Sequence, residues 1–512
     1  MLVHDFLQDS ADQQPDKVAL ICDGQRLTYA EIDEQANRVA HGLLAAGVQR
    51  GDRVGIWLPN SVEAVVAIFG VLKAGAVFVT INPTTKPDKL AYILGNCAAR
   101  GVFAPARQAA TAERLLRSVP SLHFSVLCGK EGKGATVIPS PHALTWADIL
   151  SSYPAARPTS GCIDVDLACL IYTSGSTGDP KGVVSTHGNV VFAASSIIRY
   201  LGNAPDDIVI DVLPLSFDYG LYQLLMTFKF GGTLVLERSF AYPAAILQRI
   251  EAERVTGLPG VPTLFAILLQ MDLSRFGLGS LRYVTNTAAA LPVAHIEQLR
   301  RAFPWTRLFS MYGLTECKRA LYLPPEELDR RPGSVGIPIP GTEAWIEDES
   351  GNQLPRGATG ELVVRGSHVM QGYWNDPEET AKRYRPGRYP AERLLYTGDL
   401  FRTDDEGFFY FVARKDDIIK SRGEKVAPKE VESVLYQLPG VAEAVVVGVD
   451  DPLLGQAVKA VIVRREGAQI TELDVMRHCA SLLEDFSVPK QVEFRASLPR
   501  TPSGKVDRKS LG

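Results

Sequence analysis

The sequence predicts an α/β fold with a large N-terminal region and a smaller C-terminal unit. Three observations support this prediction: the length of 512 residues, an early alternation of strand-like and helix-like segments, and βαβ-like periodicity near the end. A single hydrophobic core stops growing at about 250 to 300 residues, so we expect at least two domains. Hydrophobic residues make up 46% and charged residues 22%, which is typical of a globular protein.

The N-terminal part alternates between apolar strand-like runs and helix-like runs. This alternation predicts a sheet with helices on both faces. Two helix-like segments end at Gly47 and Gly75, because glycine tolerates the left-handed conformation with which a helix turns back toward a strand. The segments are, in order, "KVALICDG", "YAEIDEQANRVAHGLLAAG", "DRVGIWLP", "SVEAVVAIFGVLKAG", "AVFVTIN", "KLAYILGNCAA" and "GVFAPA".

The architecture changes in the second half of the chain. Glycine-rich turns interrupt short apolar runs over 341–366, which predicts an antiparallel sheet or a small barrel. A charged segment after Tyr396 leads into the compact C-terminal unit. We place the boundary near Lys415 and Asp416, which gives domains 1–414 and 415–512.

Charge and cysteine content exclude several classes of protein. Fifty-four basic residues against 58 acidic ones give a net charge of -4, so no nucleic-acid partner is expected.

The N-terminus carries acids in place of a basic secretion signal, and no apolar run reaches the roughly 18 to 20 residues of a membrane span. We therefore expect a cytoplasmic protein. The seven cysteines form no CxxC pair, so neither a disulfide framework nor a zinc site is indicated.

The stretch "YTSGSTGDPKG", from Tyr172 to Gly182, predicts an anion-binding loop. Glycines leave backbone N–H groups accessible, and hydroxyls and a lysine add further donors. The spacing differs from GxxxxGK[ST], which argues against a Walker-type NTPase. A flexible surface turn is the alternative, although the buried strand before it and "PKG" after it favour phosphate binding. The candidate residues are Thr173, Ser174, Gly175, Ser176, Thr177, Gly178 and Lys181.

With four further segments, this loop resembles the adenylate-forming enzymes, which include acyl-CoA synthetases, adenylation domains of peptide synthetases and luciferases. The resemblance covers most of the chain, and the segments occur in the family's order. They are "YGLTE" at 312–316, "YTGDL" at 396–400, "RKDDIIKSRGEKVAPKEVE" at 414–432 and "LPRTPSGKVDR" at 498–508.

The resemblance implies both a fold and a reaction. The fold is a large N-terminal domain of stacked αβ sheets with a small β-barrel-like part, followed by a small mobile α+β C-terminal domain. In the reaction a carboxylate joins the α-phosphate of ATP and releases pyrophosphate, and the acyl group then passes to a nucleophile. The expected cofactors are ATP and Mg²⁺, with coenzyme A as co-substrate.

The resemblance also implies roles around the nucleotide. The loop from Thr173 to Lys181 would hold the β- and γ-phosphates, and Thr315 would contact the α-phosphate. Glu316 would help to bind Mg²⁺, which prefers oxygen ligands. Tyr312 would lie against adenine. Fixed donors and cations suit this step because negative charge develops on oxygens around phosphorus.

Further roles belong to the boundary and the C-terminal unit. Asp399 would accept hydrogen bonds from the ribose hydroxyls, supported by Arg414, and Lys505 would bridge the substrate carboxylate and the α-phosphate. Asp416 stands at the hinge position, and Gly423 would leave space for an incoming thiol arm after domain rotation. Taken singly, Asp399 could be a turn residue and Lys505 a solvated surface lysine.

Phe217 and Asp218 stand where many acyl-CoA synthetases carry a histidine. Asp218 has three interpretations. It could pair with an amino group of the substrate, since a buried ammonium needs a counter-charge. It could accept a proton from an attacking amine, as in relatives that resemble coronafacate ligase. It could also only cap the helix that begins near Tyr219.

The acid pocket is expected to be mostly apolar, which suits acyl or aryl acids. Small residues in the stretch 285–291 would allow close approach, although alanines of a core helix are the alternative. Cys317 and His187 are expected to be structural. The expected lining comprises Tyr219, Tyr222, Leu225, Gly260 within 257–262, and Ala288 and Ala289 within 285–291.

The leading hypothesis is therefore transfer of the acyl group to coenzyme A, because Gly423 and its surroundings keep the thiol-approach pattern. Transfer to an amine, or to the phosphopantetheine of a carrier protein, is the rival that Asp218 motivates. A nucleotide-binding regulator without catalysis is a third possibility, against which the presence of Lys505, Glu316 and Asp399 argues.

Overall fold

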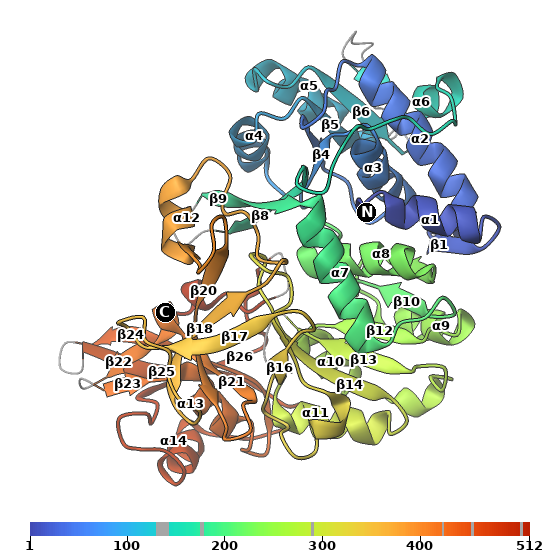
Figure 1. Cartoon of the computed structure of the whole chain (residues 1–512). Helices are drawn as coiled ribbons and strands as arrows, with labels where there is room; N and C mark the ends of the chain where they lie inside the picture. The colour runs from blue at the N-terminus through green and yellow to red at the C-terminus, as the bar shows by residue number, and fades with distance from the viewer. Residues whose placement is uncertain (130–142, 175–178, 288–290, 422–423, 452–454, 502–504) are drawn as a thin grey trace.

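The computed structural model describes residues 1–129, 143–174, 179–287, 291–421, 424–451, 455–501 and 505–512. Within these residues the chain forms two large sheets flanked by helices, an antiparallel sheet, and a smaller C-terminal sheet (Figure 1). The predicted α/β fold, with a large N-terminal domain of sheets and a small C-terminal domain, is confirmed. No described helix is both long and apolar enough to cross a membrane.

The seven-stranded sheet has the order β7-β6-β5-β3-β4-β8-β9 and is parallel except for the β8–β9 hairpin. Gly75 follows α3 with a φ of +78°, as its place between helix and strand predicts. The elements are β3 (Arg53–Ile56), α3 (Val62–Lys73), β4 (Val77–Thr80), α4 (Pro87–Asn96), β5 (Gly101–Pro105), α5 (Ala109–Ser118), β6 (Phe124–Cys128), β7 (Ala143–Thr145), α6 (Trp146–Ser152), β8 (Leu167–Ser174) and β9 (Pro180–Thr186).

The nine-stranded sheet has the order β16-β15-β14-β13-β12-β10-β11-β1-β2. The first strand of the chain belongs here, because Leu20 pairs with Leu234 of β11. The elements are α1 (Asp5–Gln13), β1 (Val18–Cys22), β2 (Gln25–Thr28), α2 (Tyr29–Ala45), α7 (His187–Leu201), β10 (Ile208–Asp211), α8 (Asp218–Phe230), β11 (Thr233–Leu236), α9 (Pro243–Ala252), β12 (Gly257–Gly260), α10 (Pro262–Leu268), β13 (Tyr283–Asn286), α11 (Val293–Ala302), β14 (Arg307–Tyr312), β15 (Leu321–Tyr322) and β16 (Ile337–Pro338).

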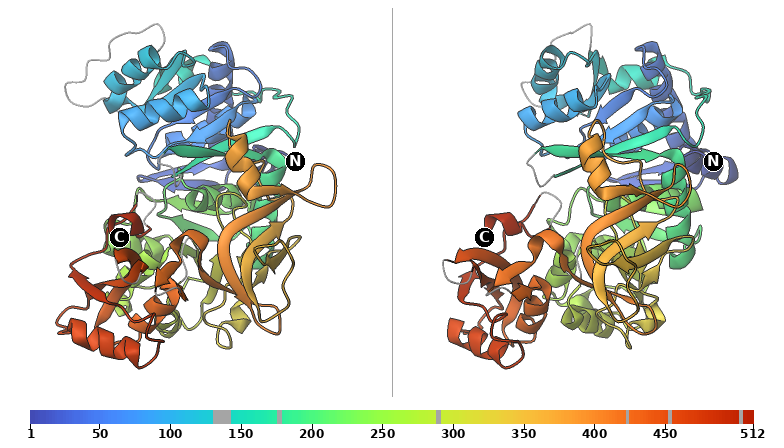
Figure 2. Two further views of the ribbon diagram at one scale, coloured as in Figure 1. Left: turned by 90° about the vertical axis from the view of Figure 1, so that its left-hand side faces the viewer. Right: turned by 60° about the vertical axis from the view of Figure 1, so that its left-hand side comes forward.

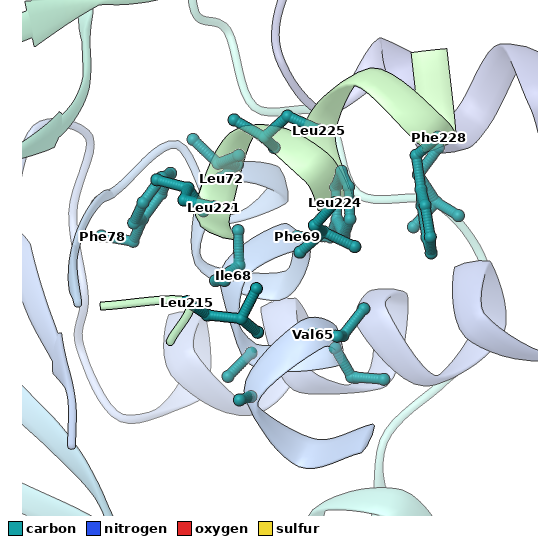
Figure 3. Close-up of a cluster of buried hydrophobic side chains, with 14 of the residues drawn as sticks. Val65, Ile68, Phe69, Leu72, Phe78, Leu215, Leu221, Leu224, Leu225 and Phe228 are labelled. Carbon is teal, nitrogen blue, oxygen red and sulfur yellow. The ribbon is translucent and has the colours of Figure 1, made fainter. Parts of the chain in front are cut away.

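The main apolar core lies between the two large sheets and joins them through α3 and α8 (Figure 3). Helix α3 is apolar on nearly every side, as expected of a fully buried helix. Phe69 of α3 stacks on Phe228 of α8 with a ring-centroid separation of 5.2 Å. Burial of each such side chain contributes about 1.5 to 3 kcal/mol to folding. The two sheets are therefore held together by one shared core.

A five-stranded antiparallel sheet follows, as the turn-rich sequence predicts. Its order is β17-β18-β20-β19. Strand β19 pairs with residues 393–395 of β20, and β21 pairs with residues 399–403 of the same strand. Its core includes Leu362, Val364, Leu395 and Phe401. The elements are β17 (Glu343–Glu347), β18 (Thr359–Arg365), α12 (Pro377–Arg383), β19 (Tyr384–Pro386), β20 (Arg393–Thr403) and β21 (Phe409–Arg414).

The C-terminal unit has its own sheet and its own apolar core. Strands β25 and β26 are parallel and are connected through α14, which confirms the predicted βαβ periodicity. This unit lies beside the nine-stranded sheet (Figure 2), where Tyr436 meets His295 edge to face and Arg500 donates to Thr263. The elements are β22 (Ile419–Ser421), β23 (Glu424–Val426), α13 (Pro428–Leu435), β24 (Val441–Asp451), β25 (Gly455–Arg464), α14 (Glu472–Ala480) and β26 (Gln491–Arg495).

Candidate functional site

A buried carboxylate lies where the nine-stranded sheet meets the antiparallel sheet. Tyr312, the last residue of β14, donates from its hydroxyl to Asp399 Oδ2 at 2.6 Å. Asp399 pairs with Arg414 across β20 and β21, and Arg414 Nε lies 3.2 Å from Asp399 Oδ1. Burial raises the pKa of Asp399, whereas the Arg414 charge and the Tyr312 hydroxyl oppose the rise. Asp399 is thus a strand residue inside a polar cluster and is not a turn residue.

Asp399 keeps capacity for a further hydrogen bond. Its side chain is only 3% exposed, and its Oδ1 accepts no hydrogen bond from the described part of the chain, although Arg414 lies near. A buried carboxylate oxygen without a donor is costly. The hydroxyls of a ribose are donors of the kind that this oxygen lacks.

The turn after β14 carries Thr315 and Glu316. Gly313 is required there, because an added Cβ would lie 1.9 Å from the Lys318 carbonyl oxygen. The N–H groups of Cys317 and Lys318 both donate to the Leu314 carbonyl, which closes the turn. The Thr315 and Glu316 side chains are half-buried, so they remain accessible at the end of the strand.

Glu316 is oriented by a residue that the sequence analysis did not single out. The Tyr373 hydroxyl donates to Glu316 Oε1 at 2.6 Å, and the Met370 N–H donates to the Glu316 carbonyl oxygen at 2.9 Å. Among the described residues no group of three or more His, Cys, Asp and Glu side chains forms a metal site. Any Mg²⁺ here would therefore need further ligands from phosphates or water.

Lys505 comes to the same cluster from the C-terminal unit. Burial and the Arg414 charge lower its pKa, whereas the charges of Asp218, Asp399 and Glu316 raise it. Solvent still reaches the side chain. The Thr501 N–H donates to the Lys505 carbonyl oxygen at 2.8 Å, and Arg500 and Val506 form an isolated antiparallel bridge. The charges of these three acids thus act on Lys505, although the residue is exposed and forms no ion pair with them.

The predicted anion-binding loop is only partly described. Thr173 and Lys181 pair across the β8–β9 hairpin, and Ser174 pairs with Pro180. Gly175, Ser176, Thr177 and Gly178 lie outside the described residues, as does the Ser174 side chain.

Lys181 has a partner that the sequence analysis did not find. Its Nζ lies 2.5 Å from Glu379 Oε2 of α12. Hydrogen bonds from Lys181 and Lys382 lower the pKa of Glu379 to about 2. Glu379 therefore stays ionised at neutral pH and pairs with Lys181.

Helix α8 corrects one interpretation of Asp218. The helix begins at Asp218 itself, Phe217 is the N-cap residue, and no side chain caps this end. The interpretation of Asp218 as the N-cap residue is therefore wrong. The helix starts one residue earlier than expected, so Asp218 lies in its first turn. A carboxylate in that position still suits the helix dipole.

The residues expected to line the acid pocket are packed closely. Tyr219 donates to the Thr285 carbonyl oxygen at 2.9 Å, and Tyr222 is 1% exposed. An added Cβ at Gly260 would lie 2.5 Å from the Phe265 ring. Leu225 is buried in the shared core.

Other predicted positions lie elsewhere or outside the description. Ala288, Ala289 and Gly423 are outside the described residues. Asp416 lies in the 3₁₀ turn Lys415–Asp417 after β21 and is exposed to solvent.

Two buried cations follow Glu316 and were missed by the sequence analysis. Lys318 Nζ lies 5.6 Å from the centre of the Tyr222 ring, and the Arg319 guanidinium carbon lies 4.7 Å from that of Tyr219. Lys318 is 1% and Arg319 4% exposed. The sequence did contain an indication of two buried cations, because "KR" stands between "YGLTEC" and the apolar "ALYL".

Cys317 and His187 are structural, as expected. Cys317 is fully buried among apolar side chains, and burial raises the pKa of its thiol, which disfavours a nucleophilic thiolate. His187 Nδ1 accepts the Val3 N–H at 3.0 Å, and burial lowers the pKa of His187 to about 4. Its neutral ring therefore fastens the N-terminus to α7.

The fold and this cluster of charged side chains define an enzyme of the AMP-forming ligase class. The model of the "AMP-binding enzyme" family matches residues 7–374, and that of the "AMP-binding enzyme C-terminal domain" matches 430–505. The chain belongs to the AMP-binding enzyme family. This confirms the resemblance on which the expected site was based.

Relatives and solved structures agree with this assignment. The chain is 33% identical to a long-chain-fatty-acid–CoA ligase of Bacillus subtilis (strain 168), over 99% of this chain and 93% of the relative. The anthranilate CoA ligase AuaEII, in complex with anthranoyl-AMP, matches with a TM-score of 0.91 and 28% identity, over 100% of this chain and 96% of that one. The amide bond synthetase McbA from Marinactinospora thermotolerans matches with a TM-score of 0.86 and 30% identity, over 100% and 99%.

Proposed function

We propose that this protein is an ATP- and Mg²⁺-dependent ligase that activates a carboxylic acid as its acyl-adenylate, releases pyrophosphate, and then passes the acyl group to coenzyme A. The observation that carries this proposal is the buried Asp399 carboxylate, which the Tyr312 hydroxyl and Arg414 hold while Oδ1 accepts no hydrogen bond from the described residues. We expect Lys505 to place a positive charge where negative charge develops during the reaction. The family assignment and the likeness to an acyl-AMP complex support the same reaction.

The residues of the chain divide the first step between them. Asp399, held by Tyr312 and Arg414, binds the ribose, and Tyr312 lies against the base. Lys505 and Thr315 stabilise the negative charge that develops around the α-phosphorus as the acid oxygen attacks and pyrophosphate leaves. Mg²⁺, when bound beside Glu316, supplies further positive charge to the phosphates.

The remaining phosphate contacts come from the β8–β9 hairpin. We place the β- and γ-phosphates against the loop from Thr173 to Lys181. Lys181 would then exchange its Glu379 partner for a phosphate. This loop connects two antiparallel strands, so its anion binding would depend on backbone N–H groups and side chains, without a helix N-terminus.

The second step requires the C-terminal unit to turn about Asp416. Rotation would break the His295–Tyr436 and Arg500–Thr263 contacts and would remove Lys505 from the phosphorus. Coenzyme A would then approach past Gly423.

An amine, or the phosphopantetheine thiol of a carrier protein, is the alternative acceptor. Asp218 supports the amine, because its charge acts on Lys505 and its carboxylate could take a proton from an attacking nitrogen. The likeness to an amide bond synthetase supports it equally.

The test has two stages. Acid-dependent pyrophosphate release across a broad panel of carboxylic acids tests adenylation, and its absence with every acid would contradict the proposed function. With an accepted acid, mass analysis of products formed with coenzyme A or with excess amine identifies the acceptor. Thioester formation supports coenzyme A, whereas amide formation without thioester supports the alternative.

A further inference from the structure

Lys318 and Arg319 are buried against two tyrosines of the expected acid pocket, and neither cation has an acidic partner among the described residues. In the described part of the chain Lys318 Nζ and Arg319 Nε have no hydrogen-bond partner, and neither residue takes part in an ion pair. Arg319 Nη1 donates to the Lys318 carbonyl oxygen at 3.0 Å. The hydroxyl of Tyr222, whose ring lies under Lys318, is also buried and has no hydrogen-bond partner among the described residues.

Such an arrangement is unfavourable for folding. A buried cation costs free energy unless an acceptor or an opposite charge compensates for it. The faces of Tyr222 and Tyr219 attract the two cations, which offsets part of this cost, but a ring face accepts no hydrogen bond in the manner of a carboxylate. Groups that reduce stability in this way are typical of binding sites.

The two cations pack against the two tyrosines that follow Asp218 on α8. Tyr219 and Tyr222 follow Asp218 on α8, and Asp218 is one of the acids that approach Lys505. Burial raises the pKa of Tyr222, and the opposing charges of Asp218 and Arg319 both act on that hydroxyl. Asp218 and Tyr222 are four residues apart on α8 and therefore share one face of that helix, and Lys318 lies over the Tyr222 ring.

We infer that the acid substrate carries a second anionic group, which Lys318 and Arg319 bind while the reacting carboxylate lies beside Lys505. Tyr222 would donate a further hydrogen bond to that group. This inference rests on the proposed function and changes one expectation, since a mostly apolar pocket suits acids with one charge. A charged hydrogen bond from each cation to that group would satisfy Lys318 Nζ and Arg319 Nε, which lack an acceptor in the described part of the chain.

Matched acids test the inference. We would measure ATP–pyrophosphate exchange with aliphatic, aromatic and amino-substituted dicarboxylic acids, each against its monomethyl ester, which keeps the length and loses the second charge. We expect at least one diacid to exceed its ester in kcat/KM by about 10-fold or more, as loss of a charged hydrogen bond predicts. Preference for the ester in every pair would overturn the inference alone. No exchange with any acid would contradict the proposed function as well.

Variants distinguish a role of Lys318 and Arg319 in substrate binding from a purely structural role. Lys318→Met and Arg319→Met should abolish the diacid preference and raise the melting temperature, because each removes a buried charge without an acidic partner. Arg385→Met is the control, since Arg385 also lies over a tyrosine ring, 3.8 Å from the centre of Tyr396, but in the antiparallel sheet. It should leave the preference unchanged.

Tyr222→Phe keeps the ring and removes only the hydroxyl, so it tests the same site if the methionine variants do not fold. It should reduce the diacid preference by several-fold, within the roughly 10-fold that one hydrogen bond supplies. A lower melting temperature with an unchanged diacid preference in the methionine variants would show that the cations are structural and would overturn the inference.

Discussion

Tyr373 donates a hydrogen bond from its hydroxyl to Glu316 Oε1 at 2.6 Å, although 57 residues separate the two in the sequence. Tyr373 thereby fixes the orientation of the Glu316 carboxylate, which we propose as a ligand of Mg²⁺. A charged hydrogen bond of this kind contributes about 1.5 to 3 kcal/mol.

Tyr373→Phe should therefore weaken the response of adenylation to Mg²⁺. We expect the Mg²⁺ concentration at half-maximal pyrophosphate exchange to rise by about 10-fold or more. In a Glu316→Gln background the same substitution should have little further effect, because the two residues act together. Equal effects of Tyr373→Phe in both backgrounds would contradict this coupling.

Glu379 competes with phosphate for Lys181 in our account. Glu379→Gln should lower the KM for ATP by about 2- to 5-fold, since an ion pair with solvent access contributes only about 0.2 to 1 kcal/mol. Glu378→Gln is the matched control, because it removes a neighbouring charge from the same helical turn. An increase in KM caused by Glu379→Gln would show that the carboxylate supports nucleotide binding.

His295 predicts acid sensitivity of the folded state. Burial, together with the charges of Arg465 and Lys429, lowers its pKa from an ordinary value of 6.5 to about 4. Between these values the unfolded chain binds a proton that the folded chain does not, so stability is present above pH 6.5 and is lost as the pH falls toward 4. The loss reaches roughly 3 kcal/mol for a shift of this size.

His295→Phe keeps an aromatic ring beside Tyr436 and cannot take up the proton. Calorimetry at about pH 7.5 and about pH 5 should show a smaller fall in melting temperature for this variant than for the wild type. An equal fall in both proteins would mean that His295 does not contribute. His123→Gln, at an exposed histidine, provides the control.

The early helices and strands were predictable because their signals are local. The segment "YAEIDEQANRVAHGLLAAG" forms α2 (Tyr29–Ala45), which begins at a capping box between Thr28 and Glu31. Sheet membership was not predictable, since the pairing of Leu20 with Leu234 depends on residues far apart in the sequence. Alternation alone therefore predicts layers and leaves the assignment of each strand to its sheet open.

The candidate site shows the same division. Motifs predicted roles for Lys505, Glu316 and Asp399, and in the structure the charges of the two acids act on Lys505. Their supporting partners were missed, because Tyr373 and Glu379 come from a segment without a recognisable pattern. The N-cap interpretation of Asp218 failed by a single residue, within the usual uncertainty of a helix boundary.

The central claim is that Lys505 acts on the phosphorus only in the first step. Its most direct test compares Lys505→Ala with the wild type in two half-reactions: pyrophosphate exchange with an accepted acid, and acyl transfer from the supplied acyl-adenylate. We predict a loss of about 10²- to 10³-fold in exchange, with transfer nearly unchanged. Equal losses in the two half-reactions would contradict the account.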